Sequence, residues 1–115
     1  MRIAALGFAL FAVVSTPAFS AGAVFMGLNK ITARNAEIDI TQDEIVEYGS
    51  LNIHLIHCQP NVSEQQGDGA LVEITEAKAD RRMNDVFRGW LFAGAPSLNA
   101  VQHPFYDLQL TRCQD

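Results

Sequence analysis

At 115 residues, of which 49% are hydrophobic, the chain has room for one domain with its own core and not for a second of ordinary size. Its formal net charge is -5. A chain with this balance has no basic stripe that could neutralise a phosphate backbone, which argues against nucleic acid as a partner and disfavours acidic membrane surfaces.

The first twenty residues have the layout of an export signal. Arg2 gives a positive start, and the apolar run from Ile3 to Val14 is shorter than the roughly 20 residues that a membrane span needs. Ala18-Phe19-Ser20 then supplies the small residues that a signal peptidase requires before its cleavage point. We therefore expect residues 1–20 to be a signal peptide and residues 21–115 to form one β-rich domain, periplasmic or secreted, with no membrane span. The alternative is an apolar N-terminal helix of a cytosolic domain.

The two cysteines, Cys58 and Cys113, make one possible pair. Because export would place them in an oxidising compartment, we predict a disulfide bond between them. Closing this loop contributes about 4 kcal/mol in the chain-entropy model. The alternatives are two free thiols or a metal pair, and the metal pair would need further ligands close in the sequence, which the flanking residues do not supply.

Beyond residue 21, apolar residues recur with the period of two that is typical of strands. Leu51, Ile53 and Leu55 share one face of the clearest strand, and Gly49-Ser50 supplies a tight turn from residues 44–48 into it. Further strands are expected at residues 36–40, 70–76, 87–92 and 106–113. This pattern predicts an all-β fold, a small sandwich or barrel of about six or seven short antiparallel strands.

Three segments are expected to lie outside the strands. Gln59 to Gly69 and Gly94 to Pro104 are predicted to be loops, the second containing one short helical turn at residues 97–101 that Ser97 would cap. The charged segment from Glu76 to Asp85 is predicted to be a solvated turn or a short helix.

The histidines suggest little chemistry. His54 and His57 lie three apart on a strand, which would put them on opposite faces and argues against a metal site. For His103, the favoured interpretation is a ring that hydrogen-bonds a backbone carbonyl or Asp107 and fixes the adjacent loop. In the alternative, Asp107 raises the pKa of His103 and makes it a general base, with Arg88 positioning an anionic substrate. Motifs for a serine nucleophile, a dinucleotide or a P-loop are absent from the sequence, so no cofactor is predicted.

Aromatic residues gather at 87–92 and again at 105–106. Alternation along the first segment places Arg88, Trp90 and Phe92 on one face and Phe87, Gly89 and Leu91 on the other. The aromatic residues could all be core. If one face is solvated instead, its aromatic side chains next to an arginine are typical of a binding surface. The candidate binding residues are Arg88, Trp90, Phe92, His103 and Tyr106.

The sequence resembles the exported alphaproteobacterial proteins classed as domain of unknown function 2155. The resemblance covers residues 24–113 and rests on Gly27 to Arg34, on Tyr48 to Leu51 leading to Cys58, and on Phe87 to Ala93 followed by Pro96, Leu98, His103-Pro104, Tyr106-Asp107 and Cys113. It implies export to the periplasm and a disulfide between Cys58 and Cys113, and it supplies no activity.

Together these observations favour a non-catalytic binding module of the cell envelope whose partner is an unknown envelope protein or cell-wall component. One alternative is a small hydrolase or metal-dependent enzyme that uses His103 and Asp107. Another is a proteinaceous inhibitor of an envelope hydrolase, which would need a protruding loop, and Gln59 to Gly69 is the candidate for that loop.

Overall fold

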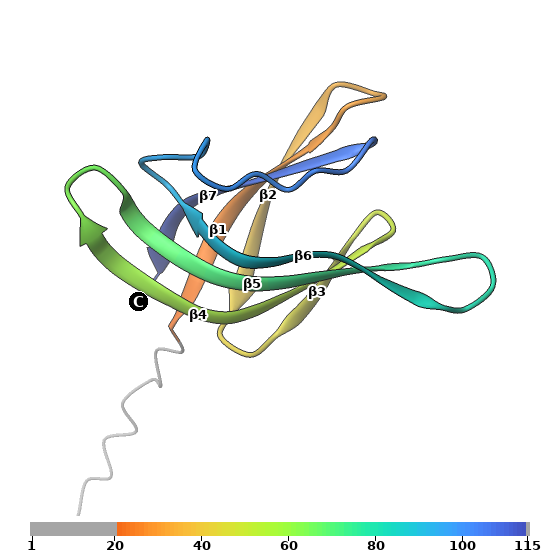
Figure 1. The fold of residues 1–115 in the computed structure, drawn as a ribbon, viewed down its shortest axis with the longest axis horizontal. Helices are drawn as coiled ribbons and strands as arrows, with labels where there is room; N and C mark the ends of the chain where they lie inside the picture. The colour runs from red at the N-terminus through yellow and green to blue at the C-terminus, as the bar shows by residue number, and fades with distance from the viewer. Residues whose placement is uncertain (1–20, 115) are drawn as a thin grey trace, which may run out of the picture.

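A computed structural model of the chain describes residues 21–114 and shows an all-β fold, as predicted (Figure 1). The predicted signal peptide, residues 1–20, lies outside the described residues. The seven strands are β1 (Gly22–Asn29), β2 (Arg34–Thr41), β3 (Ile45–Tyr48), β4 (Leu51–Ser63), β5 (Gly67–Ala77), β6 (Met83–Phe92) and β7 (Tyr106–Gln114). Within residues 21–114, no helix has the length and apolar character to cross a membrane.

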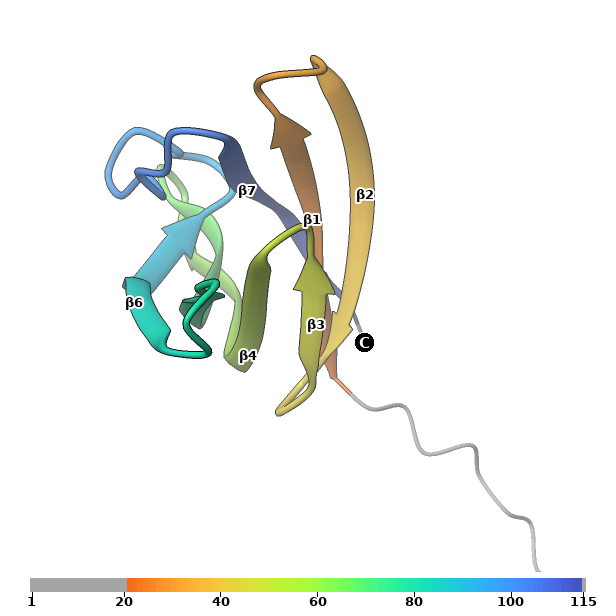
Figure 2. The same cartoon turned by 90° about the vertical axis from the view of Figure 1, so that its right-hand side faces the viewer.

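The strands form two antiparallel sheets that pack as a sandwich. One sheet has the order β2-β1-β7 and the other the order β3-β4-β5-β6. Figure 2 views the two layers from the side, with β6 and β2 on opposite sides of the molecule. The chain crosses between the sheets twice, once after β2 and once through the long segment between β6 and β7.

The core lies between the sheets and is built from every second residue of each strand. In the three-stranded sheet, Phe25 is fully buried and is flanked across the sheet by Ile38 and Leu110. In the four-stranded sheet, Ile53 and Ile74 are paired across β4 and β5 and are also fully buried. Removing such side chains from water is the main favourable term in folding, so the alternation seen in the sequence is the reason for this fold.

A bulge in β4 changes which side chains face outward. The pairing with β5 passes from Leu55 opposite Val72 directly to His57 opposite Leu71, so Ile56 is an extra residue in β4. The bulge returns Cys58 to the core and turns His57 outward, onto the same outer face as His54. The prediction that the two histidines lie on opposite faces is therefore wrong, because counting by twos fails across a bulge.

The predicted turn at Gly49-Ser50 is confirmed, and two glycines bring the sheets close together beside it. Gly49 has a φ of 59°, a conformation that favours glycine, and a Cβ added to it would clash with the Tyr106 hydroxyl. Gly27 lies beneath the ring of Tyr48, where a Cβ would be 2.7 Å from the ring atom Cζ. A larger residue in place of Gly27 or Gly49 would thus fill the space that the Tyr48 or Tyr106 side chain occupies.

Two of the predicted irregular segments are the ends of β-hairpins, and only the first differs from its prediction. Residues 59–69 are paired strand apart from a short turn, because β4 continues to Ser63 and β5 begins at Gly67. A loop was predicted here because the segment contains Pro60 and two glycines. In the structure, the strands accommodate Pro60 through an irregular register between Gln59 and Ser63. Residues 76–85 hold an exposed turn at residues 78–82 between the ends of β5 and β6, so the predicted solvated turn is confirmed and the alternative, a short helix, is not found there.

The segment between β6 and β7 is a loop as expected, but the helical turn predicted at residues 97–101 is wrong. A 3.1 Å hydrogen bond from the Leu98 amide to the Ala95 carbonyl closes a tight turn, and this turn ends before residue 101. The next residue, Asn99, donates its side-chain amide to the Trp90 carbonyl at 2.8 Å, and Val101 is buried. The Asn99 side chain thus ties this part of the loop to β6, and no helical turn forms over residues 97–101.

Candidate functional site

The outer face of the four-stranded sheet carries a group of half-buried aromatic and apolar side chains. His57, Leu71 and Trp90 are directly paired across β4, β5 and β6, and they form one row on this face. Phe92 lies two residues after Trp90 and on the same face. We call these four residues, together with Gln59 and Val62 at their margin, the outer aromatic patch.

The rings of the outer aromatic patch are ordered relative to one another. The Trp90 and Phe92 rings are nearly parallel, with centroids 6.5 Å apart and an interplanar angle of 11°. The His57 ring meets Trp90 edge-on at 6.4 Å. Gln59, Val62, Trp90 and Phe92 line a shallow depression in the surface. Ring geometry of this kind gives a partner a defined apolar surface to pack against.

A solvated ion pair borders the outer aromatic patch. Arg88 and Glu73 pair directly across β6 and β5, with Nε 3.9 Å from Oε2 and 75% of the arginine side chain exposed. A pair this open to solvent contributes about 0–1 kcal/mol to stability. The guanidinium can therefore turn toward a bound partner at little cost to the fold.

His103 lies away from this face, on the inner side of the four-stranded sheet and near the end of β5. The side chain is buried, and its Nε2 is 2.7 Å from the Oε2 of Glu76 on β5. Its Nδ1 accepts a hydrogen bond from the Phe105 amide at 3.0 Å. Because an amide can only donate, Nδ1 carries no proton and Nε2 must donate to Glu76. The histidine therefore joins its own loop to the four-stranded sheet.

Ser50 and the side chain of Lys30 complete this cluster of hydrogen bonds. The Ser50 hydroxyl donates to the same Glu76 oxygen at 2.7 Å, and the Lys30 ammonium donates to the His103 carbonyl at 2.9 Å. Hydrogen bonds from Ser50 and then from His103 hold the pKa of Glu76 below its ordinary value. We call Ser50, Glu76 and His103 the Glu76 cluster.

The Glu76 cluster has the composition of a catalytic triad but not its connectivity. In a triad the histidine lies between the nucleophile and the carboxylate, whereas here the carboxylate lies between Ser50 and His103. The serine therefore has no histidine to accept its proton and faces only a carboxylate whose lowered pKa makes it a weak base, while both ring nitrogens of His103 are already engaged. This arrangement is suited to joining parts of the fold.

Asp107 does not take part in the Glu76 cluster. It lines a small depression on another surface together with Phe92, Pro96 and Asn99. The His103 ring was predicted to bond a backbone carbonyl or Asp107; among the described residues its partners are instead Glu76 and the Phe105 amide. Glu76 and Ser50 were missed by sequence reasoning because they lie 27 and 53 residues before His103, and no motif spans those gaps.

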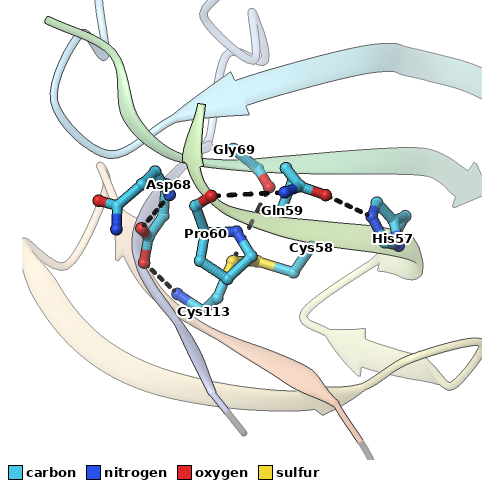
Figure 3. The surroundings of a disulfide bond; sticks show 8 residues. His57, Cys58, Gln59, Pro60, Asp68, Gly69 and Cys113 are labelled. Carbon is cyan, nitrogen blue, oxygen red and sulfur yellow. Dashed lines mark hydrogen bonds between the residues drawn. A yellow bond between two sulfur atoms is a disulfide. The ribbon is translucent and has the colours of Figure 1, made fainter. Parts of the chain in front are cut away.

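The predicted disulfide is confirmed at the opposite end of the sandwich. Cys58 and Cys113 are bonded with a Cα–Cα distance of 5.7 Å, joining β4 to β7 across the two sheets. Figure 3 shows Asp68 beside the bond, where its carboxylate accepts the Cys113 amide at 2.8 Å and the Asn61 amide at 3.0 Å. Asp68 thus fixes both the β4–β5 hairpin and the end of β7.

The five candidate binding residues fall into two separate places. Arg88, Trp90 and Phe92 lie together on the outer face of β6, as alternation predicted. His103 is buried in the Glu76 cluster, and Tyr106 packs against Tyr48 at the same end of the inner face. Within residues 21–114, no group of three or more His, Cys, Asp or Glu side chains is placed to hold a metal ion.

Comparison with known proteins shows a family match that covers almost all of the described chain. A family model with the description "Uncharacterized protein conserved in bacteria (DUF2155)" matches residues 23–113. The chain is also 34% identical over 89 residues to "Uncharacterized protein RP359" of Rickettsia prowazekii (strain Madrid E). That match covers 76% of this chain and 57% of the relative, so the chain spans little more than half of the relative's length. No solved structure matches.

Proposed function

The chain belongs to the DUF2155 family, whose description assigns no activity. From the side chains on its surface, we propose that it is a non-catalytic binding module of the bacterial cell envelope. The observation that carries the proposal is the outer aromatic patch. A tryptophan and a phenylalanine with nearly parallel rings lie on the solvent side of a sheet whose other side already forms the core.

The position of the patch favours a binding role over a packing role. The core has its own aromatic and aliphatic side chains between the sheets, so Trp90 and Phe92 are not needed to fill it. Val62, beside them, is 41% exposed. Tryptophan is among the residues most enriched at binding hot spots, where it is surrounded by contacts that exclude water. A partner that covered this face would bury apolar area now open to solvent.

The envelope location is part of the proposal. Disulfides persist in oxidising compartments, and the Cys58–Cys113 bond is compatible with a protein outside the cytoplasm. We propose that residues 1–20 are removed as a signal peptide and that the mature protein is periplasmic or secreted. Mass analysis of protein purified from its native cell tests this: the expected chain begins at Ala21 and contains no alkylatable thiol, whereas an intact Met1 end with two thiols would contradict it.

The geometry gives less support to the two alternatives. The enzyme hypothesis needed His103 and Asp107 to act together in a cleft, whereas His103 is bonded on both ring nitrogens and Asp107 lies elsewhere. The inhibitor hypothesis needed a protruding loop at residues 59–69. This segment is a paired hairpin, and its end is tied down by hydrogen bonds from the Gly94 amide to the Gln66 carbonyl and from Cys113 to Asp68.

The binding role is tested by affinity capture with a variant that removes both rings. Purified, disulfide-bonded protein carrying Trp90→Ala and Phe92→Ala is compared with the unaltered protein as bait for a detergent-solubilised envelope fraction and for purified cell wall. We expect the unaltered protein to retain a specific component and the variant to lose it. Circular dichroism and thermal unfolding establish that the variant is folded.

A matched control uses an exposed hydrophobic side chain from another surface. Met26, on the outer face of β1 in the other sheet, is 38% exposed, so Met26→Ala removes apolar area without touching the outer aromatic patch. This control should retain the component. Equal capture by the folded double variant and the unaltered protein would count against the patch as the binding surface.

A further inference from the structure

The inner face of the three-stranded sheet extends past the four-stranded sheet at one end. Its last inward row consists of Arg34, Asn29 and Tyr106, which are directly paired across β2, β1 and β7. The row before it contains Gly27 and is covered by Tyr48 of β3. The side chains therefore change from apolar core to a polar row where the covering sheet ends.

The uncovered row forms one wall of a broad groove that is open to solvent. The groove runs between the β1–β2 hairpin and the β3–β4 turn, and its lining includes Thr32, Arg34, Asn35, Tyr48, Gly49 and Tyr106. These residues come from three separate stretches of the sequence and from both sheets. We call this feature the tyrosine groove.

The floor of the tyrosine groove is held rigidly. The Tyr48 and Tyr106 rings meet edge to face at 5.3 Å, Tyr48 rests on Gly27, and the Tyr106 hydroxyl lies against Gly49. Among residues 21–114, no hydrogen-bond partner is found for either hydroxyl. Burial, followed by the neighbouring Tyr106, raises the pKa of Tyr48, so its hydroxyl keeps its proton at neutral pH and can both donate and accept.

The wall that carries Arg34 is also fixed in place. Asn29 accepts the amides of Ile31 and Thr32 at 3.0 and 3.2 Å, which closes the β1–β2 turn. Lys30 is tied through its side chain and its amide to the loop at residues 103–105. A groove held in this way needs little ordering when a ligand binds.

Arg34 supplies a positive charge that the fold does not use. Its side chain is exposed, and no carboxylate lies within ion-pair distance of it in the part of the chain that the structure describes. A guanidinium pairs strongly and with defined geometry to a carboxylate. One cation in a chain with a net charge of -5 suits a singly charged carboxylate better than a doubly charged phosphate.

We propose that the tyrosine groove binds a saccharide that carries a carboxylate. The tyrosine rings offer flat surfaces to the C–H face of a sugar ring, their hydroxyls offer hydrogen bonds to sugar hydroxyls, and Arg34 pairs with the acid group. An open groove, unlike an enclosed cavity, admits a unit within a longer chain. The site is separate from the outer aromatic patch and does not depend on it.

The test is a titration of the purified, disulfide-bonded protein followed by nuclear magnetic resonance. Two acidic saccharides represent the two sources of such a unit: N-acetylmuramic acid oligomers, whose acid is a lactyl ether, and oligogalacturonate, whose acid is on the ring. N-acetylglucosamine oligomers and a short polyglutamate serve as neutral and acidic controls. We expect at least one acidic saccharide to shift the amides of Gly49 and Ala36 while the indole signal of Trp90 stays unchanged, and the saccharide that binds identifies the source.

The variants separate the acid contact from general charge. We expect Arg34→Gln to weaken binding about tenfold or more and Tyr106→Phe to weaken it about threefold. Arg112→Gln removes a charge that is also exposed, at the other end of the fold, and should change affinity less than about twofold.

Four results would overturn the proposal. The first two are neutral oligomers, or polyglutamate, that bind as tightly as the acidic saccharides. The third is equal weakening of binding by Arg34→Gln and Arg112→Gln. The fourth is the absence of any shift with every saccharide up to ~10 mM, a concentration that would reveal even weak binding.

Discussion

The two ends of this sandwich are closed by different kinds of bond. At one end, the Cys58–Cys113 disulfide and Asp68 join β4 to β7. At the other, the two sheets are linked through the loop before β7 by the hydrogen bonds of the Glu76 cluster. We refer to these as the disulfide end and the Glu76 end.

The difference has consequences for both stability and function. A disulfide acts largely by restricting the unfolded chain, so the disulfide end needs few other contacts to stay closed. Hydrogen bonds contribute only in the native state and depend on protonation. The tyrosine groove lies at the Glu76 end, next to Gly49 and Tyr106. We infer that the covalent bond secures the fold while the hydrogen-bonded end leaves a rigid surface open to ligand.

The largest expected effect comes from removing the disulfide. Replacing both cysteines, Cys58→Ser with Cys113→Ser, should lower the free energy of unfolding by about 4 kcal/mol, because a loop with a sequence separation of 55 residues is released in the unfolded state. Urea unfolding followed through Trp90, the single tryptophan, measures the change. A reducing agent should produce a similar loss in the unaltered protein and none in the variant. A loss below about 1 kcal/mol would mean that the closed loop contributes little.

A comparison of two glycines tests how tightly the Glu76 end is packed. Gly49 and Gly67 have similar positive φ values of 59° and 67°, so alanine costs about 1–2 kcal/mol at either site. At Gly49 the added methyl also clashes with the Tyr106 hydroxyl, whereas at Gly67 the nearest atom is the Gly94 nitrogen at 3.2 Å. Gly49→Ala should therefore destabilise by roughly 1 kcal/mol more than Gly67→Ala in the same urea assay. Equal losses would show that Tyr106 can move aside.

A smaller effect is expected when the central carboxylate of the Glu76 end is neutralised. Glu76→Gln keeps the side-chain shape but weakens its two charged hydrogen bonds, which should cost about 1–2 kcal/mol. Glu73→Gln, which weakens the solvated pair with Arg88, is the matched control and should cost less than about 0.5 kcal/mol. Similar losses of unfolding free energy for the two variants would show that the Glu76 cluster stabilises the fold no more than an exposed ion pair does.

The pH dependence of that difference is the finest test. The folded-state pKa of Glu76 is lowered from 4.5, so its contribution to stability is fully present above pH 4.5 and is lost as the pH falls through the folded-state pKa. The stability difference between the unaltered protein and Glu76→Gln should be constant near neutral pH and should shrink in acid. A difference that stays unchanged to pH ~3 would contradict the linkage argument.

The sequence was most informative about local alternation and least informative about distant contacts. Leu51, Ile53 and Leu55 predicted a buried strand face because period-two burial is a property of neighbouring residues. The cysteines predicted the disulfide because their number and expected compartment left one pairing. The order of the sheets and the link from Glu76 to His103 could not be predicted, since they depend on how segments far apart in the chain meet.

Local irregularities caused the remaining errors. The bulge at Ile56 moved His57 onto the outer aromatic patch, where it meets Trp90. Pro60 and the glycines of residues 59–69 were predicted to break the strands, but β4 accommodates Pro60 by an irregular register and a positive φ of 48° at Asn61. The face of β6 was predicted correctly because the register of this strand is regular from Phe87 to Phe92.

The most direct test of the proposed function is site-specific photo-crosslinking in intact cells. Val62 beside the outer aromatic patch and Met26 on the outer face of the other sheet are exposed to a similar extent, 41% and 38%. A photoreactive amino acid placed at residue 62 should capture a discrete envelope component, and Trp90→Ala should abolish the product, while the same probe at residue 26 should capture none. Equal products at the two positions, or a product at residue 62 that survives the loss of Trp90, would contradict the claim that this face is the binding surface.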